Sequence, residues 1–255
     1  MFQLYIHKDK GLTDNLIDRC KRSGFKAMCL TVDTVVAGNR ERDHRWGFTT
    51  PPKLTLKSLL SFATHPMWSI NYLTHEKFQL ANVSHFTKKG SSIAKGVMEY
   101  INEQYDPKMN WQDAEYCIKR WGGPFAIKGV MSVEDAKRAV EIGASAIMLS
   151  NHGGRQLDGS RSPFDQLPAI AEAVGGKLEI ILDGGVRRGT HVLKALSLGA
   201  TACSFGKGYL FALGAGGQKG VEALLQRMHD EIRRDMILLG CKTIKDLKKT
   251  NIAYR

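Results

Sequence analysis

The sequence lacks the features that mark membrane-spanning, secreted and metal-stabilised proteins. No apolar run approaches the roughly 18 residues that a membrane span requires. Charged and polar residues appear already at positions 7–10, so the first residues do not form a signal peptide. The five cysteines are scattered and form no C-x-x-C pair, which is typical of buried free thiols in a reducing compartment. We therefore expect a cytoplasmic protein without disulfides or a metal site.

A concentrated patch of charge is also missing. The formal net charge is +12, but the excess of Lys and Arg is spread along the chain rather than gathered in one basic arm. A diffuse positive charge attracts phosphates, acidic substrates or anionic lipid, and it is equally consistent with a solvated basic surface. The sequence therefore predicts no nucleic-acid partner.

What the sequence does contain is an alternation of short β-rich runs with amphipathic helical runs. This alternation is typical of βαβ units in a parallel sheet. We predict strands at 2–6, 26–33, 124–130, 145–150, 179–185 and 201–206. We predict helices between or after them at 12–23, 132–142, 165–174, 188–198 and 216–239. The predicted fold class is therefore α/β with six parallel strands.

Positions 36–110 interrupt the alternation. The segment contains Pro51, Pro52 and Pro66 and no clean strand, and we interpret it as a long loop insertion in a single domain spanning 1–255. About 180 residues remain, which at roughly 30 residues per unit accommodate six βα units rather than the eight of a closed barrel. Because Met1 leads directly into a strand, we expect the chain to begin in the middle of a domain.

The densest group of chemically active residues is LSNHGGRQLDG at 149–159, directly after an apolar strand. Parallel α/β folds place their active sites at such strand ends. His152 can act as a base near neutral pH, and Arg155 can bind a carboxylate with two hydrogen bonds. A lone loop histidine is more often structural, but the Gly-Gly turn and the arginine beside this one favour a catalytic role.

Two further strand ends combine glycine with cations. LDGGVRRG at 182–189 ends a strand with a carboxylate, two glycines and two arginines before a helix, and FGKG at 205–208 adds another glycine and a lysine. Glycines let backbone amides approach a ligand closely, and helix N-termini attract anions. Either motif alone is equally well explained as a glycine turn with solvated cations. In adjacent units they favour a phosphate site.

Polar residues also occur inside the predicted strands. Lys128 lies in the apolar run FAIKGV, where an unpaired ammonium is costly, so it needs a partner and could be a Schiff-base or an anion-stabilising lysine. Thr31 and Asp33 share one face of their strand by the period of two, and Gln3 and Tyr5 do so in theirs. Each of these is otherwise explained as a satisfied core group or a turn residue.

These motifs together resemble the FMN-dependent 2-hydroxy acid dehydrogenases and oxidases, a family that includes glycolate oxidase, L-lactate dehydrogenase, mandelate dehydrogenase and flavocytochrome b2. The resemblance covers essentially the whole chain and follows the family's order through FQLY, LTVDT, GNRERD, IKGV, SNHGGRQLDG, LDGGVRRG and FGKGYL. It implies a TIM (β/α)₈ barrel with FMN at the C-terminal mouth. These motifs then correspond to the third to eighth strands, with the N-terminal segment and first two strands absent.

The resemblance also implies roles for individual residues. It makes His152 the catalytic base, with Asp33 stabilising its imidazolium, and places Lys128 against the flavin edge where reduction builds negative charge. Its substrate-binding residues are Tyr5, Arg40 and Arg155. Its FMN-binding residues are Gln3, Thr31, Lys128, Ser150, Asp183, Gly185, Arg187, Gly206 and Lys207. Lys207 stands where the family usually has arginine, which keeps the charge but loses the two-pronged hydrogen bonding.

Segment 51–75 mixes apolar and aromatic residues with lysines, and it resembles the membrane-associated members of the family. We expect it to contact the inner face of a membrane, and the alternative is a loop folded over the active site.

For the activity we expect oxidation of an L-2-hydroxy acid, L-lactate favoured, with quinone or O₂ as electron acceptor, in a homo-oligomer. The alternatives are (S)-mandelate dehydrogenase or 2-hydroxy acid oxidase activity, and an inactive fragment or binding module that holds no flavin. Another phosphate-binding barrel, similar to IMP dehydrogenase, is disfavoured by His152 and Arg155. With two strands fewer than the family barrel, we expect residues 1–255 alone to bind FMN poorly.

Overall fold

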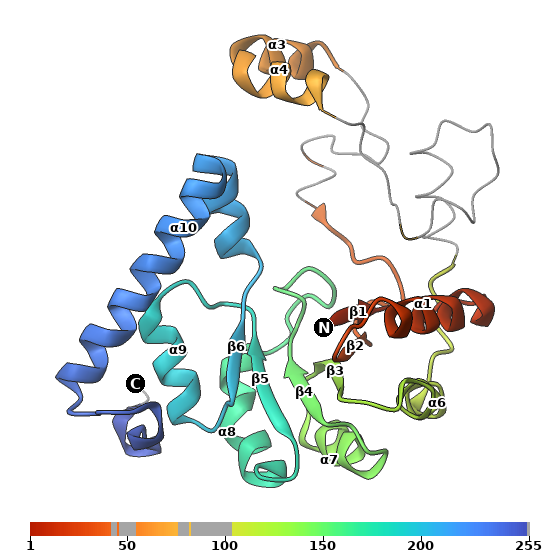
Figure 1. Ribbon diagram of the computed structural model, residues 1–255, viewed down its shortest axis with the longest axis vertical. Coiled ribbons are helices and arrows are strands. Elements are labelled where there is room, and N and C mark those ends of the chain that lie inside the picture. The colour runs from red at the N-terminus through yellow and green to blue at the C-terminus, as the bar shows by residue number, and fades with distance from the viewer. Residues whose placement is uncertain (42–44, 46–54, 76–81, 83–103, 254–255) are drawn as a thin grey trace.

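Six parallel strands form one sheet in the computed structural model, which describes residues 1–41, 45, 55–75, 82 and 104–253. The strands follow one another across the sheet in chain order, so every neighbour in the sheet is also the next strand along the chain (Figure 1). Their bounds are β1 Phe2–Leu4, β2 Met28–Thr31, β3 Phe125–Val130, β4 Ala146–Leu149, β5 Glu179–Asp183 and β6 Ala202–Ser204. The predicted α/β class and the number of strands are confirmed.

Helices connect the strands and cover one face of the curved sheet (Figure 1). They are α1 Lys10–Arg22, α6 Trp111–Trp121, α7 Val133–Glu141, α8 Pro163–Val174, α9 Gly189–Ser197 and α10 Lys207–Leu238. α10 begins earlier than predicted because a first helical stretch runs up to a break at Gly216 and Gly217, whose backbone angles are not helical. We did not predict α6, which lies just after the supposed insertion.

The two faces of the sheet differ in packing because side chains alternate along each strand. Toward the helices, Leu30, Ile127 and Ile147 belong to one large buried cluster. On the concave face, the buried cluster is small and consists of Cys29, Ala126 and Met148. Among the described residues, this face therefore carries much less apolar packing than the face toward the helices.

The register places the ends of the strands in rows. Thr31 of β2 lies opposite Lys128 of β3, and Asp183 of β5 lies opposite Ser204 of β6. Because all described strands are parallel, their carboxyl ends meet at one edge, and the loops that follow them can converge on a single ligand. Among the described residues β1 pairs only with β2 and β6 only with β5, so the sheet is open, as expected for six units rather than eight.

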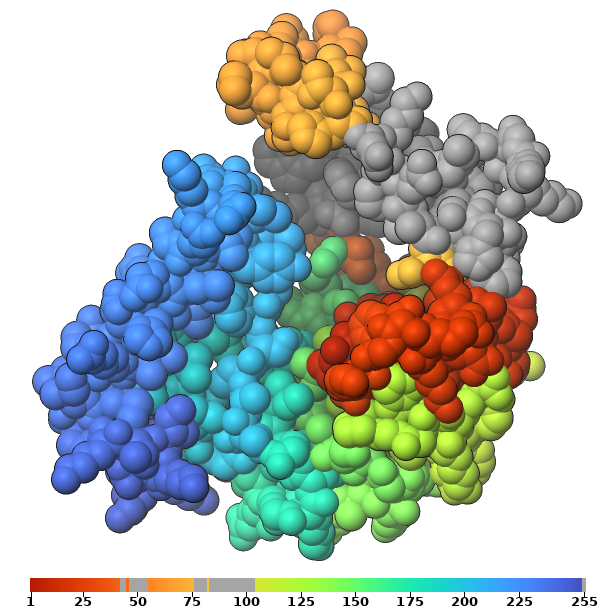
Figure 2. Space-filling model, in the orientation of Figure 1, coloured from red at the N-terminus to blue at the C-terminus, as the bar shows by residue number. Residues whose placement is uncertain are grey.

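The described part of the predicted insertion 36–110 contains two helices, α3 Leu56–Thr64 and α4 Pro66–Thr74. They lie at one end of the molecule (Figure 2), away from the sheet (Figure 1). Thr55 caps α3 through a reciprocal pair of hydrogen bonds with Ser58, and neither helix has a buried residue. Positions 51–54 lie outside the described residues. No helix in the described ranges is long and apolar enough to cross a membrane.

Two short 3₁₀ helices, η2 Ile244–Asp246 and η3 Lys249–Asn251, follow α10 near the end of the chain. Earlier in α10, Glu231 closes the first turn of α9. It is 7% exposed, and its Oε2 accepts a hydrogen bond from Gly189 N at 2.8 Å. Arg227 and Arg188 lie 3.2 and 3.6 Å from Oε1. The hydrogen bond from Gly189 and the two positive charges hold the pKa of Glu231 below its usual 4.5.

We predict that Glu231→Gln lowers the free energy of unfolding by about 1 kcal/mol at neutral pH, the usual scale of a helix-capping interaction. The glutamine keeps the acceptor for Gly189 N but loses the charge. A carboxyl group with a lowered folded-state pKa stabilises the protein above its unfolded pKa and stops doing so as pH falls through the folded value. The difference between native protein and variant should therefore shrink as pH falls below 4.5 and vanish once pH is below the lowered folded-state pKa of Glu231. Urea unfolding at several pH values measures it, and a pH-independent difference contradicts the role of the charge.

Candidate active site

A cavity of about 850 Å³ lies at the carboxyl edge of the sheet. This volume is within the usual range for small-molecule and cofactor sites. The residues predicted from sequence that line it are Gln3, Tyr5, Lys128, His152, Arg155, Asp183, Gly185, Arg187, Gly206 and Lys207. Thr31, Asp33 and Ser150 do not line it but are joined to lining residues by hydrogen bonds. Arg40 does not line the cavity.

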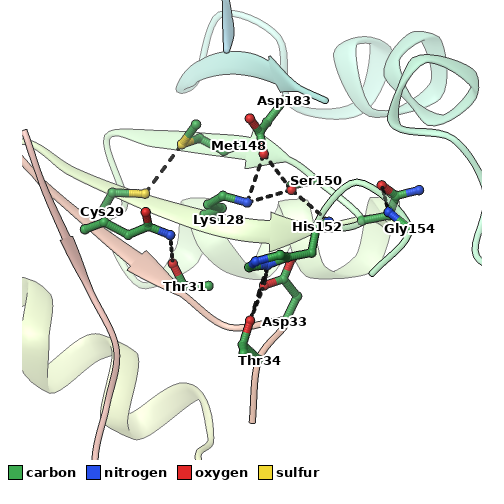
Figure 3. A network of polar contacts seen from close by, with 12 residues as sticks. Cys29, Thr31, Asp33, Thr34, Lys128, Met148, Ser150, His152, Gly154 and Asp183 are labelled. Carbon is green, nitrogen blue, oxygen red and sulfur yellow. Dashed lines mark hydrogen bonds and ion pairs between the residues drawn. The ribbon is translucent and has the colours of Figure 1, made fainter. Parts of the chain in front are cut away.

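His152 holds an unusual backbone conformation at the mouth of the cavity. Its φ of 56° makes it the one non-glycine residue with a positive φ among the described residues. Side chains rarely adopt this region, and such strain is concentrated at functional sites. The conformation directs the imidazole toward the end of β2, where Nδ1 lies 3.0 Å from Asp33 Oδ1 (Figure 3). A carboxylate oxygen can only accept, so Nδ1 carries the proton and Nε2 is the free basic atom.

Thr34 completes this pair and was missed by the sequence reasoning. It is buried, and its Oγ1 donates to Asp33 Oδ1 at 3.1 Å and lies 3.3 Å from His152 Nδ1 (Figure 3). Asp33 Oδ2 is buried and has no hydrogen-bond partner in the described part of the chain. The only signal for Thr34 in the sequence is that it directly follows Asp33.

Lys128 has the partner that its burial requires. Its Nζ lies 2.9 Å from Asp183 Oδ2 and donates to Ser150 Oγ at 2.7 Å (Figure 3). Ser150 Oγ donates to Asp183 Oδ2 at 2.7 Å and accepts from His152 N at 3.1 Å. An ion-paired ammonium fits an anion-stabilising lysine better than a Schiff-base nucleophile.

The charge of Lys128 also controls Asp183. Burial alone would raise the pKa of Asp183, but the hydrogen bond and charge of Lys128, with help from Ser150, outweigh it and hold that pKa below the usual value. Asp183 therefore stays ionised at neutral pH beside the cavity.

Gln3, Tyr5 and Thr31 form a second polar group where β1 and β2 end. Gln3 Nε2 donates to Thr31 Oγ1 at 2.7 Å and lies 3.2 Å from the Tyr5 hydroxyl. Burial raises the pKa of Tyr5, so its hydroxyl stays protonated at neutral pH and can donate a hydrogen bond into the cavity. The polar face predicted to carry Gln3 and Tyr5 is therefore in contact with the face predicted to carry Thr31.

The glycines after β5 and β6 leave open space at the far end of the cavity. Gly184 and Gly185 have φ of 98° and 74°, and a Cβ built on Gly185 or Gly206 would meet no atom within 4 Å. Arg187 also lines this end. A phosphate-bearing cofactor such as FMN fits this combination of open backbone and positive charge.

Lys207 connects this end to the histidine loop. Its Nζ donates to Gly153 O at 2.9 Å. An ammonium carries three donors, so two remain for an anion in the cavity. Arginine at this position could bind a phosphate with two parallel hydrogen bonds, whereas the lysine offers a point charge.

The loop containing Arg155 lies against the segment 36–40, which contains Arg40. Gln156 Nε2 donates to Val36 O at 3.0 Å, and a Cβ on Gly38 would lie 2.3 Å from Arg155 O. Arg40 Nε is buried without a hydrogen-bond partner in the described ranges. Sequence reasoning missed Gln156, although it directly follows Arg155.

Known proteins resemble this chain over almost its whole length. Residues 1–254 match a family model described as FMN-dependent dehydrogenase. The chain is 43% identical over 246 residues to an L-lactate oxidase of Nostoc sp., and 40% identical over 252 residues to an L-lactate dehydrogenase of Serratia proteamaculans. These matches cover 96% and 98% of the chain but 62% and 66% of the relatives. The chain thus spans just under two thirds of their length.

Solved structures share the arrangement of the strands. A crystal structure of the monotopic membrane protein (S)-mandelate dehydrogenase matches with a TM-score of 0.93 and 32% identity, over 100% of this chain and 67% of that one. A flavocytochrome b2 variant matches with a TM-score of 0.72 and 35% identity, over 96% of this chain and 51% of that one.

We predict that the Lys128–Asp183 pair is energetically coupled. Lys128→Met or Asp183→Asn alone leaves its partner unpaired in a mostly buried site, and each should lower the free energy of unfolding by about 3 kcal/mol. The double variant should lose less than the sum of the two, with a coupling of about 1–3 kcal/mol. Urea unfolding of the native protein, the two single variants and the double variant provides the double-mutant cycle. Additive losses contradict the coupling.

Proposed function

The chain belongs to the family of FMN-dependent 2-hydroxy acid dehydrogenases, and on that premise we propose that it oxidises an L-2-hydroxy acid to the 2-oxo acid. The observation that carries the proposal is the His152–Asp33 pair, 3.0 Å apart, at a cavity that Arg155 and Lys128 also line. L-Lactate is the favoured substrate because two curated relatives act on it by name.

FMN is the cofactor that we propose for the cavity. When bound, it would accept the two electrons that the substrate loses. Arg187, Lys207 and the amides around Gly185 would hold the phosphate, with Gly206 giving it access. Gln3, Thr31, Ser150 and Asp183 would present polar atoms to the rest of the cofactor. The ion-paired ammonium of Lys128 would offer positive charge where negative charge develops.

His152 would move the proton of the reaction. Its Nε2 is the free basic atom and would take a proton from the substrate, while Nδ1–H continues to donate to Asp33. The carboxylate of Asp33 would then stabilise the imidazolium, and Thr34 would hold that carboxylate in place. The strained backbone of His152 serves this role because it fixes the ring before substrate arrives.

Arg155 and Arg40 would bind the substrate carboxylate, and Tyr5 would add a hydrogen bond from its protonated hydroxyl. Arg155 lines the cavity directly. Arg40 does not line the cavity and would reach the substrate carboxylate from the neighbouring segment 36–40; its buried Nε has no hydrogen-bond partner among the described residues.

(S)-Mandelate is the second candidate substrate, because a solved relative with a TM-score of 0.93 is an (S)-mandelate dehydrogenase. Quinone and O₂ are the proposed electron acceptors. Steady-state rates with L-lactate and (S)-mandelate, each with a soluble quinone analogue and with O₂, distinguish these possibilities.

Because residues 1–255 alone are expected to bind FMN poorly, the rates are measured with FMN in excess. We predict that His152→Gln then lowers turnover by about 10²- to 10⁴-fold, the usual cost of losing a general base. FMN stoichiometry should stay unchanged, because the residues proposed to hold the cofactor lie elsewhere. His229→Gln on the exposed side of α10 is the matched control and should keep native turnover. Near-native turnover of the His152 variant would remove the basis of the proposed mechanism.

We also propose that the α3–α4 hairpin contacts a membrane surface. Trp68 and Leu73 are 53% and 80% exposed, and Phe62, Trp68 and Tyr72 stack with centroids 5.3 and 5.2 Å apart. Exposed aromatic and aliphatic side chains on short helices are typical of interfacial binding, and a positively charged protein favours anionic lipid. The monotopic (S)-mandelate dehydrogenase supports this by similarity.

We predict that replacing Leu60, Trp68 and Leu73 by Ser weakens binding to phosphatidylglycerol vesicles by at least about tenfold, because apolar area is lost from the interface. Sedimentation with vesicles measures the bound fraction. Serine at Leu225, Ile237 and Leu238, which are exposed on α10, is the control and should leave binding unchanged. Unchanged binding of the hairpin variant would favour the alternative, a cover over the active site.

A further inference from the structure

We propose that Gln156 is a positioning residue that ties the segment 36–40 to the histidine loop, so that Arg40 and Arg155 bind the same carboxylate. The inference rests on the proposed function, because it assumes that these two arginines hold the substrate carboxylate. It concerns a residue that does not itself line the cavity.

The contact between the two segments has two parts. Gln156 Nε2 donates to Val36 O at 3.0 Å. Gly38 packs against the same residue, because a Cβ at Gly38 would lie 2.7 Å from Gln156 Oε1 and 3.0 Å from its Cα. Real Cβ atoms do not approach this closely, so only glycine permits the backbones to come together here. The amide side chain is thus held between a carbonyl it binds and a glycine it packs against.

Both ends of this contact lie beside an arginine. Gln156 directly follows Arg155, and Gly38 lies two residues before Arg40. Arg40 is half-buried with an unpartnered Nε, whereas Arg155 is exposed and lines the cavity. Nothing else that is described in the structure bonds the segment 36–40 to the histidine loop. This contact therefore helps to set the spacing of Arg40 and Arg155, together with the hydrogen bonds of Asp33 and Thr34 to His152 just before the two segments.

The relative position of the two arginines should affect binding of the substrate carboxylate more than the rate of proton transfer. Two arginines bind one carboxylate well only when both reach it at once, and an error of about 1 Å can cost a large factor. His152, Asp33 and Lys128 are held by separate hydrogen bonds. A loosened segment 36–40 should therefore weaken carboxylate binding while the proton-transfer groups stay in place.

The test compares Gln156→Met with native FMN-loaded protein. Methionine keeps the length and unbranched shape of glutamine but cannot donate to Val36 O. Gln218→Met is the matched control, because Gln218 donates to Glu222 on the exposed surface of α10. Pyruvate, the product of the proposed reaction, is the probe, and calorimetry gives its dissociation constant without turnover.

We expect Gln156→Met to raise the pyruvate dissociation constant and the KM for L-lactate about tenfold, with kcat within about threefold of native. FMN stoichiometry should not change. Amide hydrogen exchange at 36–40 should become faster in this variant and stay native in Gln218→Met. Native exchange and native affinity in Gln156→Met would overturn the inference. A fall in kcat and in FMN content without a change in KM would also overturn it, since that pattern indicates general damage.

A second variant protects the test from a simple folding defect. Gly38→Ala pushes against the same contact from the other side, because its Cβ would collide with Arg155 O and with Gln156, so it should also weaken pyruvate binding. Because both changes break one contact, the double variant should lose little more than either single variant. Fully multiplicative losses would overturn the shared contact.

Arg155→Met separates this inference from the proposed function. If Arg155→Met abolishes pyruvate binding and Gln156→Met leaves it native, the proposed function stands and the inference fails. If native protein and Arg155→Met bind pyruvate equally, the proposed role of the arginines fails, and the inference fails with it.

Discussion

A buried ammonium organises the centre of this protein. Lys128 lies on β3 with a mostly buried side chain, and a charge in that position requires a paired carboxylate and further hydrogen bonds. Asp183 from β5 and Ser150, directly after β4, supply them. Ser150 also accepts from the backbone of His152, so the partner of the lysine fixes the start of the histidine loop. One electrostatic requirement therefore ties three strands to the group proposed as catalytic base.

The histidine loop is held on several sides. Asp33 and Thr34 hold the ring of His152, Lys207 binds Gly153 O, and Gln156 binds Val36 O. These contacts come from the segment after β2 and from the start of α10, which lie far apart in the sequence. A backbone conformation as unfavourable as that of His152 persists only where its surroundings hold it. The loop is therefore a product of the packing around it, not of its own local preference.

The α3–α4 hairpin differs from the rest of the chain in the way it is stabilised. The helices around the sheet bury apolar residues such as Leu167 and Ile170 against it, whereas α3 and α4 bury none. Stacking of Phe62, Trp68 and Tyr72 joins the two helices to each other (Figure 2 shows the hairpin at one end). Surface of this kind is available for an external partner, and it carries no part of the proposed chemistry.

The sequence by itself determined the strand number, the parallel α/β class and the candidate residues at the strand ends, because period-two apolar runs, glycines and chemically active side chains are local signals. It did not determine α3 and α4, which lie inside a long aperiodic stretch, or α6, which lies between that stretch and β3. Only the tertiary structure determined three contacts. Asp183 forms an ion pair with Lys128, Thr34 lies within hydrogen-bond distance of His152, and Gln156 donates to the backbone oxygen of Val36. Asp183 lies 55 positions after Lys128, His152 lies 118 positions after Thr34, and Gln156 lies 120 positions after Val36. Only strand register and loop packing bring such residues together, and neither is written in the local sequence around them.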